Sequence, residues 1–221
     1  GRWWTCPFEA VASHLPREGA VLDYGCGHGL FMHVARLRGP GRIVTGYDPD
    51  ARKLRAARAS ANGDPGLIAT EDDPLGRGDR RYEAIVLIDV LPYVPMEEGA
   101  ALVRRCYAHL APGGVLLVKE IHDRPRWKFG LTSLQEWLAV RVFGWTWTRD
   151  RRINFWQAGR LQHVLSALGG EVERVDLSRG VVYPHMLWLA FKPVGQPEVS
   201  LSTGSDHDAL THALARVERG V

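Results

Sequence analysis

Cysteine is scarce in this chain of 221 residues. The three cysteines, Cys6, Cys26 and Cys106, are odd in number and widely separated, so their spacing predicts neither a disulfide framework nor a metal site. Reduced thiols of this kind are typical of the cytoplasm. We therefore expect a cytoplasmic protein without a bound metal.

Long apolar runs are also missing. The longest, such as residues 84–88 and 115–118, have the length of a β-strand, whereas a membrane-spanning helix needs about 20 apolar residues in a row. A charged and hydrophobic leader is not visible at the start of the printed sequence. These features predict no membrane span and agree with a cytoplasmic location.

An excess of charge of one sign is absent as well. The 28 Lys and Arg residues nearly balance the 25 Asp and Glu residues, and the formal net charge is +3. Nucleic-acid-binding proteins usually carry a clustered basic stripe. One local basic cluster fits the solvated face of a helix, and it consists of Arg52, Lys53, Arg55 and Arg58. We therefore expect no nucleic-acid partner.

Glycine is concentrated directly after an apolar segment. Residues 20–24 predict a buried strand, and Gly25, Gly27 and Gly29 follow it with G-x-G-x-G spacing. Glycine tolerates positive φ and leaves room for a ligand against the backbone. A dinucleotide loop would have its third glycine where this chain has Leu30, and no G-x-x-x-x-G-K-[ST] loop occurs. A nicotinamide oxidoreductase is therefore the weaker alternative.

An acidic residue follows the next predicted strand. That strand covers residues 43–47, and Asp48 comes directly after it, about 20 residues beyond the glycines. In nucleotide-binding βαβ units the acid at this place binds ribose hydroxyls. Asp48 therefore predicts a cofactor that contains a nucleoside. Its neighbour Tyr47 could pack on the adenine or fill the sheet.

Four blocks in order resemble the motifs of class I S-adenosylmethionine-dependent methyltransferases. Residues 21–30 (VLDYGCGHGL) resemble the first motif, and residues 44–48 (VTGYD) resemble the second. Residues 82–91 (YEAIVLIDVL) resemble the fourth motif, and residues 110–118 (LAPGGVLLV) resemble the turn and strand that follow it. The resemblance implies S-adenosyl-L-methionine as the cofactor and methyl transfer as the activity.

The resemblance also implies which residues bind the cofactor. The loop and the acid before it meet the amino-acid end, the acid after the second strand accepts the ribose hydroxyls, and an acid after the third strand meets the adenine amine. Asp72 is the first choice for that last role, with its neighbour Asp73 as the alternative, and Asp89 would line the cleft or cap a helix. The small Cys26 is expected to pack within the loop and not to act as a nucleophile. The residues expected at the cofactor are Asp23, Gly25, Cys26, Gly27, Gly29, Asp48, Pro49, Asp72, Asp73 and Asp89.

Strand and helix patterns alternate along most of the chain. The predicted strands are residues 20–24, 43–47, 67–70, 84–89, 115–121, 171–176 and 185–192, and the predicted helices are residues 7–15, 29–38, 49–61, 99–110 and 160–168. This order predicts an α/β fold with a Rossmann-like, doubly wound sheet that binds its ligand beyond the carboxyl ends of the strands. The resemblance implies that the sheet is mostly parallel, with an antiparallel last strand inserted at its edge.

Residues 1–193 are expected to form one methyltransferase domain. It would contain a Trp-rich helical insertion at about residues 122–158, because most of the eight tryptophans fall between 127 and 156. The insertion could cover the substrate or pack on the sheet. Residues 194–221 are expected to form a linker and an amphipathic helix, which could dock on its own domain or join two copies as a homodimer.

Aromatic residues and histidines supply the candidates for substrate contact and for a base. The expected substrate contacts are Trp3, Trp4, Trp127, Trp137 and Tyr183. Such a wall suits a large, flat or greasy molecule, although Trp3 and Trp4 could equally pack on the sheet edge. Histidine is the natural base near neutral pH. The candidate bases, in order, are His122, His28 and His185, with Glu120 as a rival of His122.

The sequence therefore predicts a methyltransferase that acts on a small, hydrophobic molecule, such as a specialised metabolite or a lipid-like compound, at an oxygen atom. One alternative is a protein that keeps the cofactor-binding fold without methyl transfer, as a cyclase-like relative would. Another is a nucleic-acid or protein methyltransferase. Amino-group methyltransferases of nucleic acids often carry [DNS]-P-P-[YFW] after the fourth strand, and residues 89–93 (DVLPY) depart from that pattern.

Overall fold

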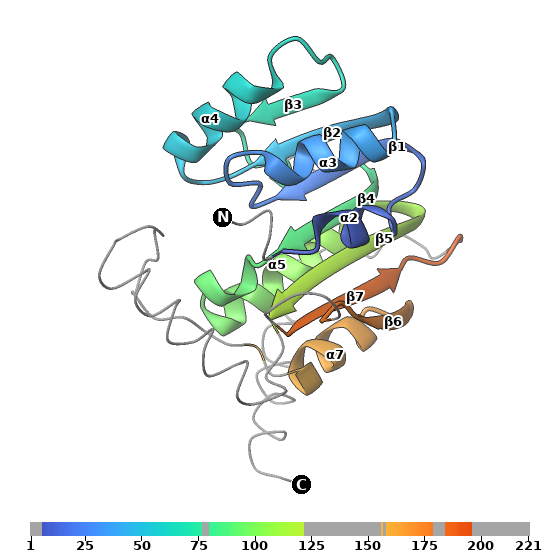
Figure 1. Cartoon of the computed structure of the whole chain (residues 1–221). Coiled ribbons are helices and arrows are strands. Elements are labelled where there is room, and N and C mark those ends of the chain that lie inside the picture. Colours follow the sequence, from blue (N-terminus) through green and yellow to red (C-terminus); the bar gives the residue numbers. More distant parts are fainter. Residues whose placement is uncertain (1–5, 77–79, 122–155, 157, 179–183, 196–221) are drawn as a thin grey trace, which may run out of the picture.

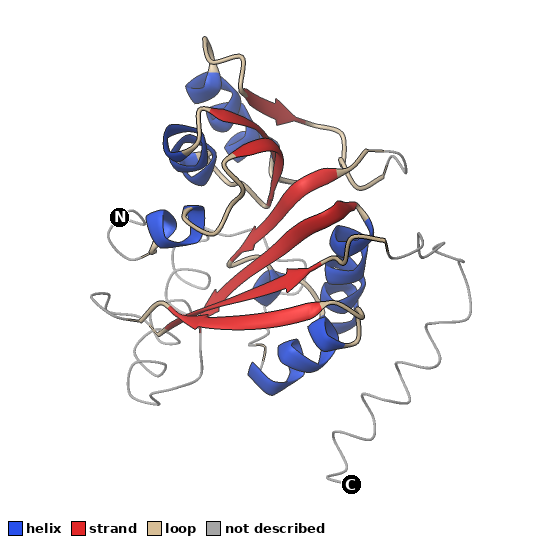
Figure 2. Cartoon of the chain, turned by 90° about the vertical axis from the view of Figure 1, so that its right-hand side faces the viewer, coloured by secondary structure: helices blue, strands red, loops and turns tan. Residues whose placement is uncertain are grey.

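The computed structural model describes residues 6–76, 80–121, 156, 158–178 and 184–195. Within this part of the chain seven strands form one sheet in the order β3-β2-β1-β4-β5-β7-β6, with helices on both sides (Figures 1 and 2). The strands are β1 Glu18–Tyr24, β2 Gly41–Tyr47, β3 Leu67–Thr70, β4 Tyr82–Ile88, β5 Leu110–Ile121, β6 Glu171–Asp176 and β7 His185–Phe191. The helices are α2 Phe8–Ala12, α3 Leu30–Arg38, α4 Ala51–Ala61, the 3-10 turn η1 Leu91–Tyr93, α5 Met96–Ala108 and α7 Ala158–Ser166.

The sheet has the predicted Rossmann-like topology. Strands β1 to β5 are parallel, whereas β7 runs antiparallel to both β5 and β6 and lies between them. The chain proceeds outward from β1 to β3 and then returns to place β4 beside β1. This reversal puts the carboxyl ends of β1 and β4 at the position where ligands bind in open α/β sheets.

Two apolar cores hold the helices on the sheet. One core packs α2, α3 and α4 on one face and includes Leu117, and the other packs α5 and α7 on the opposite face and includes Val118. These neighbours in β5 belong to different cores because successive strand side chains point to opposite faces. A fully buried leucine contributes about 1.5–3 kcal/mol of hydrophobic stabilisation. The two-sided burial explains why β4 and β5 are apolar without alternation.

Several element ends differ from the sequence expectation. Helix α5 begins at Met96 and not at residue 99, because Pro95 stands at its N-cap with φ of −55° and two acidic residues occupy its first turn. Helix α2 ends at Ala12 and not at residue 15. The 3-10 turn η1 was not predicted. In the described residues between β3 and β4 the connection contains no helix.

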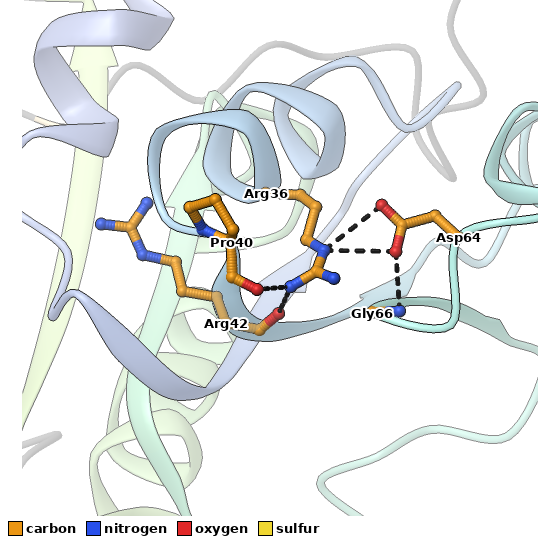
Figure 3. Close-up of polar contacts among 5 residues, drawn as sticks. All are labelled: Arg36, Pro40, Arg42, Asp64 and Gly66. Atoms are coloured by element: carbon orange, nitrogen blue, oxygen red, sulfur yellow. Dashed lines mark hydrogen bonds and ion pairs between the residues drawn. The ribbon is translucent and has the colours of Figure 1, made fainter.

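Two arginines fasten the connections at the amino edge of the sheet. Arg36 Nε lies 3.2 Å from both carboxylate oxygens of Asp64, and its Nη1 donates to the carbonyls of Pro40 and Arg42 (Figure 3). The side chain of Arg42 turns the other way and is 3% exposed. It donates to the backbone carbonyls of Pro16, Ala35, Ala12 and Leu15. Arg42 thereby ties the last turns of α2 and α3 to the start of β2.

Two further sequence expectations lie mostly outside the described residues. They are the Trp-rich insertion and the linker with its amphipathic helix. Trp156 is described, and it is buried against α5, where a Cβ on Gly99 would meet its ring at 2.7 Å. Among the described helices none combines the length and the apolar character that crossing a membrane requires.

Candidate cofactor site

The glycine loop after β1 adopts backbone conformations that other residues rarely reach. Gly25, Gly27 and Gly29 have φ angles of +86°, +57° and +83°. Gly29 is also the N-cap of α3. The loop is tied to the neighbouring strand, because the N–H groups of Gly25 and Cys26 both donate to the carbonyl of Tyr47 at 2.7 and 2.9 Å. The sequence motif therefore encodes a fixed turn at the end of β1.

Asp48 connects this loop to the end of β2. Its Oδ2 accepts the N–H of Gly27 at 2.9 Å, and its Oδ1 accepts the N–H of Asp50 at 2.9 Å. Asp50 in turn caps α4 by accepting the N–H of Arg52. A carboxylate oxygen can accept a second hydrogen bond, so these contacts leave Asp48 able to bind hydroxyl groups.

The surroundings of the three glycines differ. A Cβ built on Gly25 would lie 2.5 Å from Val90 Cγ2, and one built on Gly29 would lie 3.0 Å from Ala57 Cβ. A Cβ on Gly27 would meet no atom of the described residues within 4 Å. Within the described part of the chain Gly27 therefore faces open space beside Asp48, and a nucleoside-bearing cofactor fits the pair formed by this bare backbone and the carboxylate.

Cys26 and Asp23 are buried beside the loop. The Sγ of Cys26 lies 3.0 Å from the place of a Cβ on Gly46, so the thiol points into the sheet. Burial, and after it the charges of Asp23 and Asp48, raise the pKa of the Cys26 thiol far above its ordinary value. A neutral, enclosed thiol fits the expected packing role. Asp23 is 2% exposed at the end of β1.

Asp89 lies at the end of β4 and contacts a lysine. Its Oδ1 is 2.6 Å from Lys119 Nζ, and the side chain of Lys119 is fully buried. Among the described residues Asp89 is the one non-glycine residue with positive φ, at +54°. The alternative of a helix cap is wrong, because η1 has Val90 at its N-cap without a side-chain cap. A capping carboxylate must reach the first N–H groups of a helix, whereas this one is engaged by Lys119.

Glu120 follows Lys119 and is also buried, with 3% of its surface exposed. Its Oε1 accepts the N–H of Leu91 at 3.2 Å. Burial raises the pKa of Glu120 well above 4.5, the charge of Asp89 adds to the rise, and Lys119 opposes it. Sequence reasoning gave Lys119 no role and treated Glu120 only as a rival base. The sequence feature that could have indicated a role for them is a pair of charged residues at the end of an otherwise apolar strand.

The structure separates the two acids after β3. Asp73 Oδ2 accepts from Arg105 Nη2 at 2.8 Å, and its Oδ1 accepts the N–H of Leu75. Asp73 is thus bound to Arg105 of helix α5, whereas the side chain of Asp72 is exposed. Asp72 therefore remains the better candidate for the adenine amine. Pro49 is exposed directly after Asp48.

Tyr47 packs against Tyr24, and both side chains are partly buried. Their ring centroids are 5.0 Å apart at an angle of 46°. Burial and the nearby charge of Asp73 raise the pKa of both phenols. This contact fits the expectation that Tyr47 fills the sheet.

The candidate bases and substrate contacts are placed only in part. His28 is exposed in the glycine loop, and His185 is 2% exposed at the start of β7, where it pairs with Ile121. The remaining candidates lie outside the described residues, namely His122, Trp3, Trp4, Trp127, Trp137 and Tyr183. Phe8, which follows Trp3 and Trp4 in the sequence, is buried against Phe31 with 5.9 Å between the ring centroids.

Comparison with known proteins identifies the same fold and a methyltransferase domain. A family model described as a methyltransferase domain matches residues 7–175. A ubiquinone biosynthesis O-methyltransferase of Pseudomonas savastanoi pv. phaseolicola is 28% identical over 111 residues, which cover 48% of this chain and 46% of that protein. The chain thus spans about half the length of the curated relatives that it matches.

Solved structures agree over a larger part of the chain. An O-methyltransferase family protein from Burkholderia thailandensis superposes with a TM-score of 0.68 at 18% identity, over 86% of this chain and 56% of that one. Magnesium protoporphyrin IX methyltransferase from Synechocystis PCC 6803, which holds S-adenosylhomocysteine, gives a TM-score of 0.61 at 19% identity, over 84% and 81%. The chain therefore belongs to the methyltransferase domain family.

Proposed function

We propose that this chain transfers a methyl group from S-adenosylmethionine to an oxygen atom of a small, hydrophobic molecule, with the cofactor bound between the glycine loop and Asp48. The single observation that carries the placement is the pair formed by Gly27 and Asp48. Gly27 offers bare backbone to open space, and the carboxylate is held beside it by the N–H of Gly27. The oxygen acceptor is supported by the name of the Pseudomonas relative, an O-methyltransferase.

The residues of the chain have defined tasks in this proposal. The bound cofactor supplies a methyl group on a positively charged sulfur. Methyl transfer is an in-line displacement, so the protein contributes mainly by aligning the reactants and excluding water. Asp48 would hold the ribose hydroxyls, Asp72 would meet the adenine amine, and the loop from Gly25 to Gly29 would hold the amino-acid end. His28 and His185 remain candidate bases.

Binding of S-adenosylhomocysteine tests the site. A ligand at about 100 times its dissociation constant adds about 2.7 kcal/mol to the free energy of unfolding, which raises the melting temperature by very roughly 5–10 °C. We expect this rise in the native chain and its loss in Asp48→Ala. The matched control Asp64→Ala removes a carboxylate at the opposite edge of the sheet and keeps the rise. NADH serves as the control ligand, and a rise with NADH alone would contradict the proposal.

Product analysis tests the acceptor. The chain is incubated with S-adenosylmethionine that carries a labelled methyl group and with a panel of phenols, carboxylic acids, amines, DNA and an unrelated protein. We expect label in a small oxygen acceptor, with a product mass that is larger by one methylene. Label confined to amines, nucleic acid or protein would refute the oxygen and small-molecule assignments and leave the cofactor site standing.

A further inference from the structure

Three ionisable side chains lie together where β4 and β5 end. Lys119 Nζ is 2.6 Å from Asp89 Oδ1, and Glu120 is the next residue of β5. The side chain of Lys119 has no exposed surface, Asp89 keeps 14%, and Glu120 as a residue keeps 3%. Burying charged groups is unfavourable unless their partners compensate for the lost water. The cofactor contacts proposed above do not explain why this strand ends in two such groups.

Lys119 and Glu120 point to opposite faces of the sheet. Along β5, Leu117 packs into the core under α2–α4 and Val118 packs into the core under α5 and α7. Because strand side chains alternate, Lys119 points to the first face and Glu120 to the second. The contact of Glu120 with Leu91 agrees, since Leu91 belongs to the second core.

From these two faces both residues hold the same turn, residues 89–91. Lys119 holds Asp89 twice, because its carbonyl accepts the N–H of Asp89 at 2.9 Å and its ammonium group binds the carboxylate. Glu120 holds Leu91 through the N–H at 3.2 Å. Asp89 has φ of +54°, a conformation that residues other than glycine keep only when the surroundings fix it.

The residue between the two held positions contacts the cofactor loop. Val90 fills the space beside Gly25, where a Cβ would lie 2.5 Å from Val90 Cγ2. Gly25 is the first residue of the loop, and its N–H is bound to the end of β2. The turn therefore forms one wall of the loop, and a change in the turn shifts this wall.

We propose that Lys119 and Glu120 are positioning residues of the cofactor site: they fix residues 89–91 from both faces of the sheet, and Val90 in turn fixes Gly25. The inference rests on the proposed placement of the cofactor at this loop. If so, the two residues at the end of β5 influence the affinity for the cofactor without touching it.

Calorimetric titration with S-adenosylhomocysteine tests the inference, alongside the melting temperature without ligand. Lys119→Met leaves the carboxylate of Asp89 without its ammonium partner, and we expect the dissociation constant to rise about tenfold, within the range that positioning mutations reach. Glu120→Ala is expected to raise it about fivefold. Glu120→Gln keeps an oxygen for the N–H of Leu91 and should stay within about twofold of the native value.

A double variant and a matched control separate positioning from plain loss of stability. If Lys119 acts through the turn and Val90, the double variant Val90→Ala with Lys119→Met binds no more weakly than the weaker-binding of the two single variants. Leu161→Ala, in the buried face of α7, lowers the melting temperature and leaves the dissociation constant unchanged. The inference is overturned if Lys119→Met and Glu120→Ala melt earlier, as Leu161→Ala does, and yet bind as tightly as the native chain.

Two further results would also decide the question. If the native chain binds no S-adenosylhomocysteine, the proposed site is wrong and the inference fails with it. If Lys119→Met does not fold, Val90→Ala puts the same question, because it removes the wall beside Gly25 and leaves the ion pair in place. Native affinity in folded Val90→Ala would refute the coupling, and a weaker affinity would support it.

Discussion

Val90 occupies the space that a side chain on Gly25 would need. A Cβ on Gly25 would lie 2.5 Å from Val90 Cγ2, closer than such atoms approach in proteins, whereas a Cβ on Gly27 would meet no atom of the described residues within 4 Å. The two glycines of this loop therefore lack a side chain for different reasons. A side chain on Gly25 would clash with Val90, whereas one on Gly27 would fill the space beside Asp48.

Alanine substitutions should separate these two reasons. Gly25→Ala combines the contact with Val90 and a left-handed φ, and we expect it to lower the free energy of unfolding by about 2–4 kcal/mol. Gly27→Ala has only the backbone penalty of about 1 kcal/mol, but its methyl group enters the space assigned to the cofactor. It should lose most of the affinity for S-adenosylhomocysteine. Urea unfolding and calorimetric titration measure the two effects, and native affinity in Gly27→Ala would place the cofactor elsewhere.

A second substitution should relieve the first. Val90→Ala removes the Cγ2 atom that a side chain on Gly25 would strike. Gly25→Ala should therefore cost less stability in the Val90→Ala background than in the native chain, by about 1–2 kcal/mol, the usual size of coupling between touching residues. Urea unfolding of the four proteins of this double-mutant cycle gives the coupling. Additive costs would show that the backbone conformation, and not Val90, requires glycine.

The fold could be read from local patterns, whereas the partners of the site residues could not. The loop from Gly25 to Gly29 and the acid Asp48 were predictable, because a tight turn and a strand end each have a short sequence signature. The pairing of Asp89 with Lys119 was not, because it joins residues 30 apart in the sequence and depends on the register between β4 and β5. An acid after a strand and before a helical turn suits a cap equally well.

Two further features depended on information that a sequence pattern does not carry. Asp72 and Asp73 are adjacent in a loop, where no periodicity fixes which way each side chain points. The ion pair with Arg105 distinguishes them only once α5 is in place. Arg42 is the second residue of β2, and no sequence pattern singled it out. Its side chain can be buried because helix α2, the residues that follow α2, and helix α3 together supply four backbone carbonyls that accept its N–H groups.

Arg42 should matter for stability and not for the cofactor. Arg42→Met would remove the guanidinium donor from the carbonyls of Pro16, Ala35 and Leu15 and from that of Ala12, which also accepts the N–H of Leu15. An unsatisfied buried group costs about 1–3 kcal/mol. We expect a loss of more than about 2 kcal/mol in the free energy of unfolding and an unchanged dissociation constant for S-adenosylhomocysteine, because Arg42 lies at the start of β2, at the amino edge of the sheet. Loss of affinity in the folded variant would contradict this separation of the two edges.

Glu120 gives the free energy of unfolding a pH dependence of definite sign. Burial raises the pKa of this carboxyl well above its ordinary value of 4.5, and Asp89 adds to the rise, against the opposing effects of Lys119 and the N–H groups of Leu91 and Val90. Above pH 4.5 the folded chain keeps a proton that the unfolded chain loses. The stabilising contribution of Glu120 is therefore complete below that pH and is lost as the pH rises toward the raised pKa.

Glu120→Gln tests this sign, because glutamine is uncharged at every pH and can still accept the N–H of Leu91. The variant should become more stable relative to the native chain as the pH rises, by at most about 1.4 kcal/mol per pH unit. Urea unfolding of both proteins between about pH 5 and pH 8 measures the difference, with Leu161→Ala as a control whose difference from the native chain stays constant. A constant difference for Glu120→Gln as well would mean that Glu120 is ionised in the folded chain. Lys119 would then balance two carboxylates, and the turn would be held by charge and not by a neutral hydrogen bond.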